Sequence, residues 1–109
     1  MTFGEIIAGA RKKLGISQKE LASRIKREDG KAISPQYLND IERGRRNPPS
    51  EHLVLQLAKQ LKLPQDALVL AAGSLPSDIE DRIRRSRADP DKFEGVERAF
   101  QAFRREIKN

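Results

Sequence analysis

Two short helices with clearly marked ends lie between Ser17 and Gly44, and no other feature constrains the fold of this chain as strongly. At the start of the second helix, Ser34 can accept a hydrogen bond from a first-turn amide. Pro35 suits the first helical position, because its missing amide would have been unpaired there anyway. Gly44 supplies the left-handed cap that ends a helix. The sequence therefore predicts a short helix over residues 35–43.

The side chains of this helix divide into an apolar seam and a polar face. Leu38 and Ile41 are three residues apart and form the narrow apolar side. Gln36, Asn39 and Asp40 then project from the opposite side. Amide side chains both donate and accept hydrogen bonds, as the edges of DNA bases require. We therefore regard this face as the candidate for base recognition.

The preceding helix begins with a capping box, Ser17-Gln18-Lys19-Glu20. In such a box the serine oxygen accepts from the glutamate amide, and the glutamate side chain reaches back to the serine amide. Leu21, Ala22 and Ile25 follow at the spacing of a buried helical stripe. Capping boxes begin many ordinary helices, so the indication comes from the two helices together.

The two helices and the residues after them resemble the phage Cro and repressor-type regulators, the XRE family, over roughly residues 3–72. The resemblance is carried by SQKELA at residues 17–22, ISPQYL at 33–38 and IERGRRNP at 41–48. It implies an all-α fold with a five-helix, lambda-repressor-like helix-turn-helix domain. It also implies a protein that binds double-stranded DNA through the major groove and needs no cofactor.

Family members use the glutamine after the first cap to contact a phosphate and the exposed residues of the recognition helix to contact bases. The resemblance therefore implies that Gln18 contacts a phosphate and that Gln36 reads a base. Many phage repressors have a glutamine where this chain has Pro35, so base reading moves to Gln36, Asn39 and Asp40. Asp40 either accepts from cytosine N4 or is a solvated helix residue. The residues expected on phosphates are Ser17, Gln18, Tyr37, Arg43, Arg45 and Asn47.

The resemblance also implies a structural ion pair inside the domain. In the family, a basic residue of the first helix pairs with the glutamate that ends the recognition helix. Here these residues are Arg11 and Glu42. Such a pair would hold the recognition helix on the scaffold and would not contact DNA.

One departure from the family lies between the two central helices. Family members join them by three or four residues that contain a glycine, whereas this chain has about six more, in residues 26–32. Either the first helix of the pair continues to about Glu28 and turns at Asp29-Gly30, or the segment is a surface loop. Its basic residues then either contact phosphates or are simply solvated.

Three further helices complete the expected domain. One runs from about Thr2 to Leu14, another starts after Ser50, and the last opens at Pro64 and ends before Gly73. Packed with the central pair, they can bury a single aliphatic core. The residues expected on their buried sides are Phe3, Ile6, Ile7, Ala10 and Leu14, then Leu53, Leu57, Ala58 and Leu61, and finally Leu68.

The last third of the chain has a different character, and we expect a reading domain at residues 1–74 and a two-helix extension at residues 75–109. Ser77-Asp78-Ile79-Glu80 predicts another capping box, and Ala88-Asp89-Pro90 should interrupt the helix that follows. Apolar residues then recur at alternating steps of three and four, as in a heptad stripe. This stripe consists of Phe93, Val96, Phe100, Phe103 and Ile107.

The apolar side chains of this stripe must be buried against something, and the sequence leaves three alternatives. The last helix folds back over the core of its own subunit, pairs with a second copy, or binds a different protein. We favour the second copy, because sequence-specific helix-turn-helix proteins commonly bind two half-sites as dimers.

The charge of the chain favours a polyanionic partner. Its formal net charge is +6, and cations bind phosphates largely by displacing condensed counterions. Residues 1–76 hold 13 basic and 8 acidic residues, whereas residues 77–109 hold 9 and 8. The basic excess therefore lies with the reading domain.

Several other classes of function find no support in the sequence. The chain has no cysteine and a single histidine, His52, so we expect no metal site and no catalytic residue. No apolar stretch approaches the length of a membrane span, and the first residues lack the layout of a secretion signal. We expect a cytoplasmic protein that is not an enzyme.

The sequence as a whole predicts a sequence-specific transcriptional regulator, a repressor rather than an activator, that binds an inverted repeat as a dimer. The alternative is an antitoxin-like or adaptor protein that holds a toxin or another regulator through its C-terminal helix. An RNA-binding role is disfavoured, because the chain has one tyrosine and no tryptophan, and most of its four phenylalanines lie on the stripe.

Overall fold

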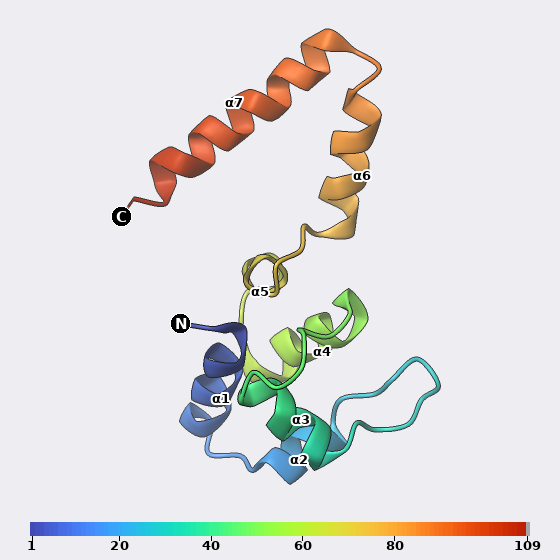
Figure 1. The fold of residues 1–109 in the computed structure, drawn as a ribbon, viewed down its shortest axis with the longest axis vertical. Coiled ribbons are helices and arrows are strands. Elements are labelled where there is room, and N and C mark those ends of the chain that lie inside the picture. The colour runs from blue at the N-terminus through green and yellow to red at the C-terminus, as the bar shows by residue number, and fades with distance from the viewer. Residues whose placement is uncertain (109) are drawn as a thin grey trace. The chain divides into compact units, whose positions relative to one another are not determined.

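The computed structural model describes residues 1–108, which form seven helices and no β-strand (Figure 1). The predicted all-α fold is confirmed. The chain divides into two compact units, Met1–Leu75 and Pro76–Asn109. The first unit contains α1 (Phe3–Lys13), α2 (Gln18–Ser23), α3 (Pro35–Glu42), α4 (Glu51–Leu61) and α5 (Gln65–Ala71), and the second contains α6 (Ser77–Ser86) and α7 (Pro90–Glu106).

Hydroxyl caps set the first residues of α2 and α3, as the sequence predicted. Ser17 Oγ accepts from the Glu20 amide at 3.0 Å, and Ser34 Oγ accepts from the Tyr37 amide at 3.0 Å. The other half of the predicted capping box is wrong. The Glu20 carboxylate does not reach back to Ser17 but accepts from Arg24 Nη2, one turn further along α2, at 2.6 Å. Gly44 has φ +72° after the end of α3, which confirms the predicted left-handed cap.

The first unit has one aliphatic core, and its members differ from the prediction at several places: Ile6 and Ala10 are only half-buried, and Ile33 and Val69 belong to the core although they were not predicted. Val54 is fully buried in α4, whereas the expected Leu53 is half-buried and packs against the core, because residues 54, 57, 58 and 61 form the complete i, i+3, i+4, i+7 stripe. Leu14 is exposed, because α1 ends at Lys13 and Leu14 serves as its cap. The buried core residues are Phe3, Ile7, Leu21, Ala22, Ile25, Ile33, Leu38, Ile41, Val54, Leu57, Ala58, Leu61, Leu68 and Val69.

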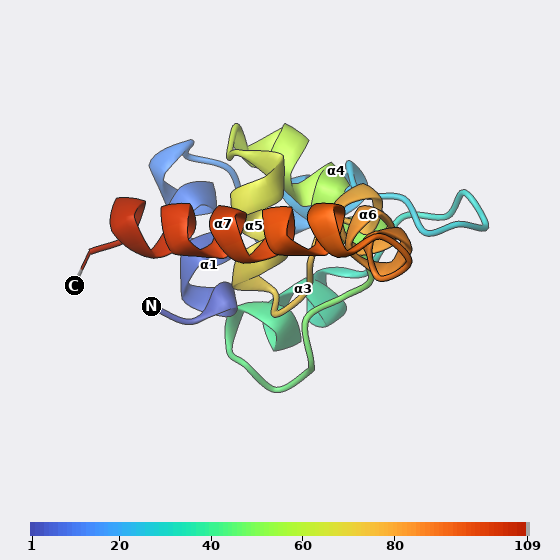
Figure 2. The same cartoon turned by 90° about the horizontal axis from the view of Figure 1, so that it is seen from above.

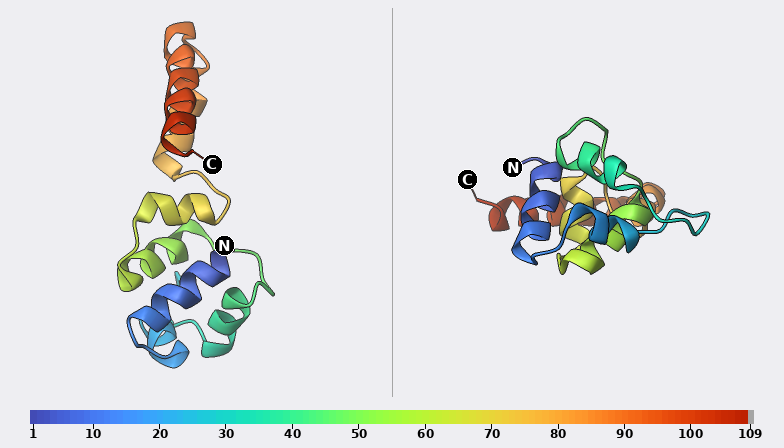
Figure 3. Two further views of the ribbon diagram at one scale, coloured as in Figure 1. Left: turned by 90° about the vertical axis from the view of Figure 1, so that its left-hand side faces the viewer. Right: turned by 90° about the horizontal axis from the view of Figure 1, so that it is seen from below.

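Helices α1 and α3 lie side by side (Figure 3), and their backbones approach each other closely at Gly4. A Cβ atom at Gly4 would lie 2.4 Å from the carbonyl oxygen of Ile41 and 2.5 Å from that of Glu42. Both distances are far below an ordinary contact, so the position requires glycine. This approach seats the C-terminal half of α3 directly against α1.

The segment between α2 and α3 is a surface loop, so the continuation of α2 to Glu28 is wrong. Lys26 and Ala32 form an antiparallel bridge, and the Arg27 amide donates to the Lys31 carbonyl at 2.8 Å. Gly30 turns the chain with φ +83°. The result is a short hairpin, residues 26–32, that projects from the helices of its unit (Figure 2).

The second unit consists of α6 and α7, which pack against each other. The predicted capping box at Ser77 is wrong by one residue: the Pro76 carbonyl accepts from the Glu80 amide at 2.9 Å, so Pro76 occupies the cap and Ser77 is already helical. The predicted interruption is confirmed, with Asp89 as the cap of α7 and Pro90 as its first residue. Among residues 1–108, no helix is long and apolar enough to cross a bilayer.

Candidate nucleic-acid interface

The polar face of α3 is formed by Gln36, Asn39 and Asp40, opposite the buried side chains of Leu38 and Ile41. Gln36 is exposed, whereas Asn39 and Asp40 are half-buried. The apolar seam holds the helix on the core and turns the amides and the carboxylate outward. The three residues predicted to read bases therefore share one face of one short helix.

A buried ion pair holds this helix at its C-terminal end. Arg11 Nε donates to Glu42 Oε2 at 2.7 Å and Arg11 Nη2 donates to Glu42 Oε1 at 2.9 Å. The two side chains are only 11% and 5% exposed. The remaining guanidinium nitrogen, Nη1, donates to the Ile16 carbonyl at 3.0 Å. The hydrogen bond to Glu42 raises the pKa of Arg11 further above its ordinary value, so the pair keeps its cation at any pH at which the protein folds.

Gln18, predicted to contact a phosphate, is bound to this ion pair through its side chain. Its Nε2 donates to Glu42 Oε1 at 3.0 Å and to Asn39 Oδ1 at 3.1 Å. An amide nitrogen has two hydrogens, so both are used inside the protein. Gln18 therefore cannot donate to a phosphate through this side chain without giving up one of these bonds.

The carboxylate of Asp40 lies close to two arginines that follow the C-terminal end of α3, Arg45 and Arg46. Its Oδ1 accepts from Gln36 Nε2 at 3.0 Å and lies 3.8 Å from Arg45 Nη1, and its Oδ2 lies 3.7 Å from Arg46 Nε. Both arginine side chains are more than half exposed. Because the hydrogen bond from Gln36 is the shortest of these contacts, Asp40 orients that amide in addition to attracting the two arginines.

The residues predicted to contact phosphates lie around this face, at the first turn of α2 and at both ends of α3. Ser17, Arg43, Arg45 and Asn47 are exposed, and Tyr37 is half-buried. Arg46, which the sequence analysis did not single out, lies with its guanidinium 4.9 Å from the centre of the Tyr37 ring. Its place in the run Arg43-Gly44-Arg45-Arg46 was the available signal.

The sequence analysis also missed the anchor of the hairpin at residues 26–32. The Lys26 amide donates to Gln56 Oε1 at 2.7 Å, and Gln56 Nε2 donates back to the Lys26 carbonyl at 2.6 Å. His52 Nε2 lies 3.1 Å from the same carbonyl. No local pattern marks this contact, because a glutamine of α4 meets a main-chain group thirty residues away. Within the hairpin, hydrogen bonds from Arg27 lower the pKa of Asp29.

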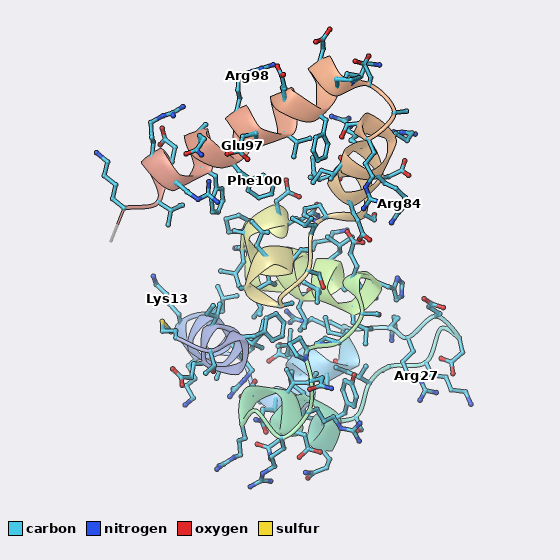
Figure 4. All side chains as sticks on the ribbon, turned by 45° about the horizontal axis from the view of Figure 1, so that its top comes forward. Lys13, Arg27, Arg84, Glu97, Arg98 and Phe100 are labelled. Atoms are coloured by element: carbon cyan, nitrogen blue, oxygen red, sulfur yellow. The ribbon has the colours of Figure 1, made fainter. Side chains whose placement is uncertain are left out.

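The heptad stripe lies on α7, in the second unit. Phe93, Phe100, Phe103 and Ile107 are all exposed, and Val96 is half-buried. Phe100 and Arg98 project from different sides of the helix (Figure 4). The exposed rings lie 41% to 52% open to solvent, which is high for phenylalanine.

Comparison with known proteins agrees with this geometry. A family model described as Helix-turn-helix matches residues 7–68, which include α2, α3 and the hairpin between them. The chain is similar to the Transcriptional regulator ClgR of Mycobacterium tuberculosis, in strains CDC 1551 / Oshkosh and ATCC 25618 / H37Rv. The identity is 33% over 87 residues, covering 80% of this chain and 69% of each relative. No solved structure matches the chain.

Proposed function

This chain belongs to the XRE family of helix-turn-helix DNA-binding transcriptional regulators, and we propose that it is a repressor that binds an inverted-repeat operator as a dimer. In this proposal α3 enters the major groove, and Gln36, Asn39 and Asp40 face the bases or orient the groups that do. The protein represses by occupying the operator. It acts in the cytoplasm and is not an enzyme.

The observation that carries the proposal is the polar face of α3, which is held outward by a buried ion pair and flanked by exposed cations. Gln36 offers adenine the donor and acceptor that its major-groove edge requires. Ser17, Arg43, Arg45 and Asn47 are exposed and Tyr37 is half-buried, and in this proposal they contact phosphates on either side of that groove and so set the register of α3. The basic excess of the first unit supports the same assignment.

The exposed stripe of α7 supports the dimer. Phe93, Phe100 and Ile107 share one heptad position. Lys92 and Glu97 flank the stripe and would face each other between two parallel copies of the helix. A second copy would cover the exposed rings and place two recognition helices on the two half-sites of a symmetric operator.

Sedimentation of two α7 variants tests the dimer directly. Phe100→Arg places a charge on the stripe and should give a monomer, whereas Arg98→Ala on another side of α7 should leave the dimer intact. A wild-type protein that sediments as a monomer at micromolar concentration would contradict the dimer. In that case the stripe would fit a different protein, as in an antitoxin or adaptor.

Selection of duplexes from a random DNA pool at near-physiological salt tests the operator. An enriched inverted repeat with half-sites about one helical turn, roughly 34 Å, apart supports the proposal. A single enriched half-site would support base reading by α3 and contradict the dimer. Salt-sensitive binding without any enriched sequence would contradict the operator and favour the alternative, a protein whose main role is to bind another protein.

Two variants separate base reading from phosphate contact. Gln36→Ala should weaken binding to the selected site by about 1 to 3 kcal/mol and leave binding to random DNA almost unchanged. Arg45→Ala should weaken both alike and reduce the salt dependence. Equal losses on the two kinds of DNA for Gln36→Ala would show that α3 has been wrongly assigned as the reading helix.

A further inference from the structure

A chain of hydrogen bonds links the buried ion pair to the reading face of α3. It runs from Arg11 to Glu42, from Glu42 to Gln18, and from Gln18 to Asn39, with distances of 2.7 to 3.1 Å. It joins α1 and α2 to the C-terminal half of α3, at Asn39 and Glu42. The direction of donation along this chain determines which atoms of Asn39 remain available to a base.

The carboxylate of Glu42 determines which end of the Gln18 side-chain amide, the nitrogen or the oxygen, faces it. A carboxylate oxygen that already accepts from a guanidinium can only accept, and Arg11 donates to both oxygens of Glu42, at 2.7 and 2.9 Å. Gln18 must therefore turn its Nε2, and not its oxygen, towards Glu42. The second hydrogen of the same nitrogen then points at Asn39, where only an acceptor can meet it.

Two hydrogen-bond donors determine the orientation of the Asn39 side-chain amide. Gln18 Nε2 lies 3.1 Å and Arg43 Nε lies 3.3 Å from Asn39 Oδ1, and both groups donate. A flipped Asn39 would bring its own NH2 group against these two donors. Its oxygen is therefore held inward. Its Nδ2 has no hydrogen-bond partner among residues 1–108 and remains free to donate.

An amide in this state does not suit adenine. Adenine presents N7 as an acceptor and N6 as a donor, so its amide partner must also accept, and the oxygen of Asn39 is already used. Guanine presents N7 and O6, both of which accept. Gln36 is in the opposite state, because its bond to Asp40 uses one hydrogen and leaves one donor and the oxygen, which is the pair that adenine needs.

We propose that Gln18 is a positioning residue that locks Asn39 as a hydrogen-bond donor, so that this protein selects guanine opposite Asn39. The inference rests on the proposed function, because it assumes that α3 reads the operator. It assigns different bases to two amides that lie three residues apart on one helix. It also gives the side chain of Gln18 a role in specificity in place of the phosphate contact that the family resemblance implied.

Selection from a random duplex pool with the full-length wild type and three variants tests the proposal. Asn39→Asp replaces the donor by an acceptor, and the base at one position of the half-site should change from guanine to cytosine, whose N4 donates. Gln18→Met removes, at similar volume, the nearer of the two donors that hold the oxygen of Asn39 inward, and it should reduce the guanine-to-adenine preference at that position, which we expect at roughly tenfold or more in the wild type. Gln36→Ala is the matched control and should relax a different position while guanine is retained.

A merely structural role for Gln18 would lower stability and overall affinity without changing the preference at one base. Thermal melts of each variant exclude misfolding, and Asn39→Asp keeps both inward contacts if Gln18→Met does not fold. The inference would be overturned if the wild type selected adenine or thymine at the position that Asn39→Asp alters. It would also be overturned if Gln18→Met kept the full preference for guanine there. Those results leave the wild-type operator in place, whereas a wild type that enriches no sequence would overturn the proposed function together with the inference.

Discussion

Replacing Gly4 by alanine should separate α1 from α3 and destabilise the first unit. The new Cβ would lie 2.4 Å and 2.5 Å from two carbonyl oxygens of α3, where an ordinary contact begins at 3.4 Å. The atoms in the way belong to the backbone, so no side chain can rotate to relieve the overlap. The two helices must therefore move apart by about 1 Å, and the well-packed core between them cannot close around the change.

The magnitude follows from two opposing terms. Overpacking a core costs about 1 to 3 kcal/mol, and a clash with two main-chain atoms lies at the upper end of that range. Alanine in place of glycine contributes up to about 1 kcal/mol of helix propensity in the other direction. We expect a net loss of about 2 kcal/mol in the free energy of unfolding, which for a unit of this size lowers Tm by roughly 8 to 16 °C.

The matched control lies five residues further along the same helix. A Cβ at Gly9 would have no atom within 4 Å, so Gly9→Ala should stabilise the protein by about 0.5 to 1 kcal/mol. Urea unfolding followed by circular dichroism measures both variants. If Gly4→Ala proved as stable as Gly9→Ala, the close approach of α1 and α3, and with it the seat of the recognition helix, would be wrong.

Three further changes test single features of the first unit by the same urea titration. Lys62 has φ +59°, so Lys62→Gly should stabilise the protein by about 0.5 kcal/mol or more, whereas Lys59→Gly inside α4 should cost about 1 kcal/mol; two losses would contradict the left-handed cap. Ser34→Ala should cost about 1 kcal/mol through the lost cap of α3, and an unchanged midpoint would mean that the cap bond does not form in solution. Glu42→Leu leaves Arg11 buried without its partner and should cost about 3 to 5 kcal/mol, most of which returns in the double variant with Arg11→Met; additive losses would rule out the coupling.

Features that depend on neighbouring residues were predictable from the sequence. The caps at Ser17 and Ser34 and the stop at Gly44 involve contacts within three or four residues, so a short stretch of sequence contains all the chemistry that they need. The break at Asp89-Pro90 is local in the same sense. Even here, one-residue errors arose where two cap candidates stood side by side, as at Pro76 and Ser77.

Features that depend on distant residues were not predictable in the same way. Nothing near Gly4 indicates that two carbonyl groups of α3 lie against it, and nothing near Gln56 indicates its bonds to Lys26. The orientation of each side-chain amide is still harder to predict from the sequence. The sequence identifies Asn39 as an amide on a polar face, but its orientation depends on Gln18, which reaches Asn39 and Glu42 only after α2 and α3 have packed.

The ion pairs around α3 differ in a way that suits a surface that must be rigid and yet exchange partners. The pair of Arg11 and Glu42 is short, bidentate and almost fully buried, so breaking it is costly and the helix keeps its place. The contacts of Arg45 and Arg46 with Asp40 are 3.8 and 3.7 Å long and involve exposed arginines, and exposed pairs contribute at most about 1 kcal/mol. A phosphate can therefore replace Asp40 at either arginine with little loss. The scaffold is thus fixed by the strong pair, and under the proposed function the weakly paired Arg45 and Arg46 would transfer from Asp40 to DNA phosphates.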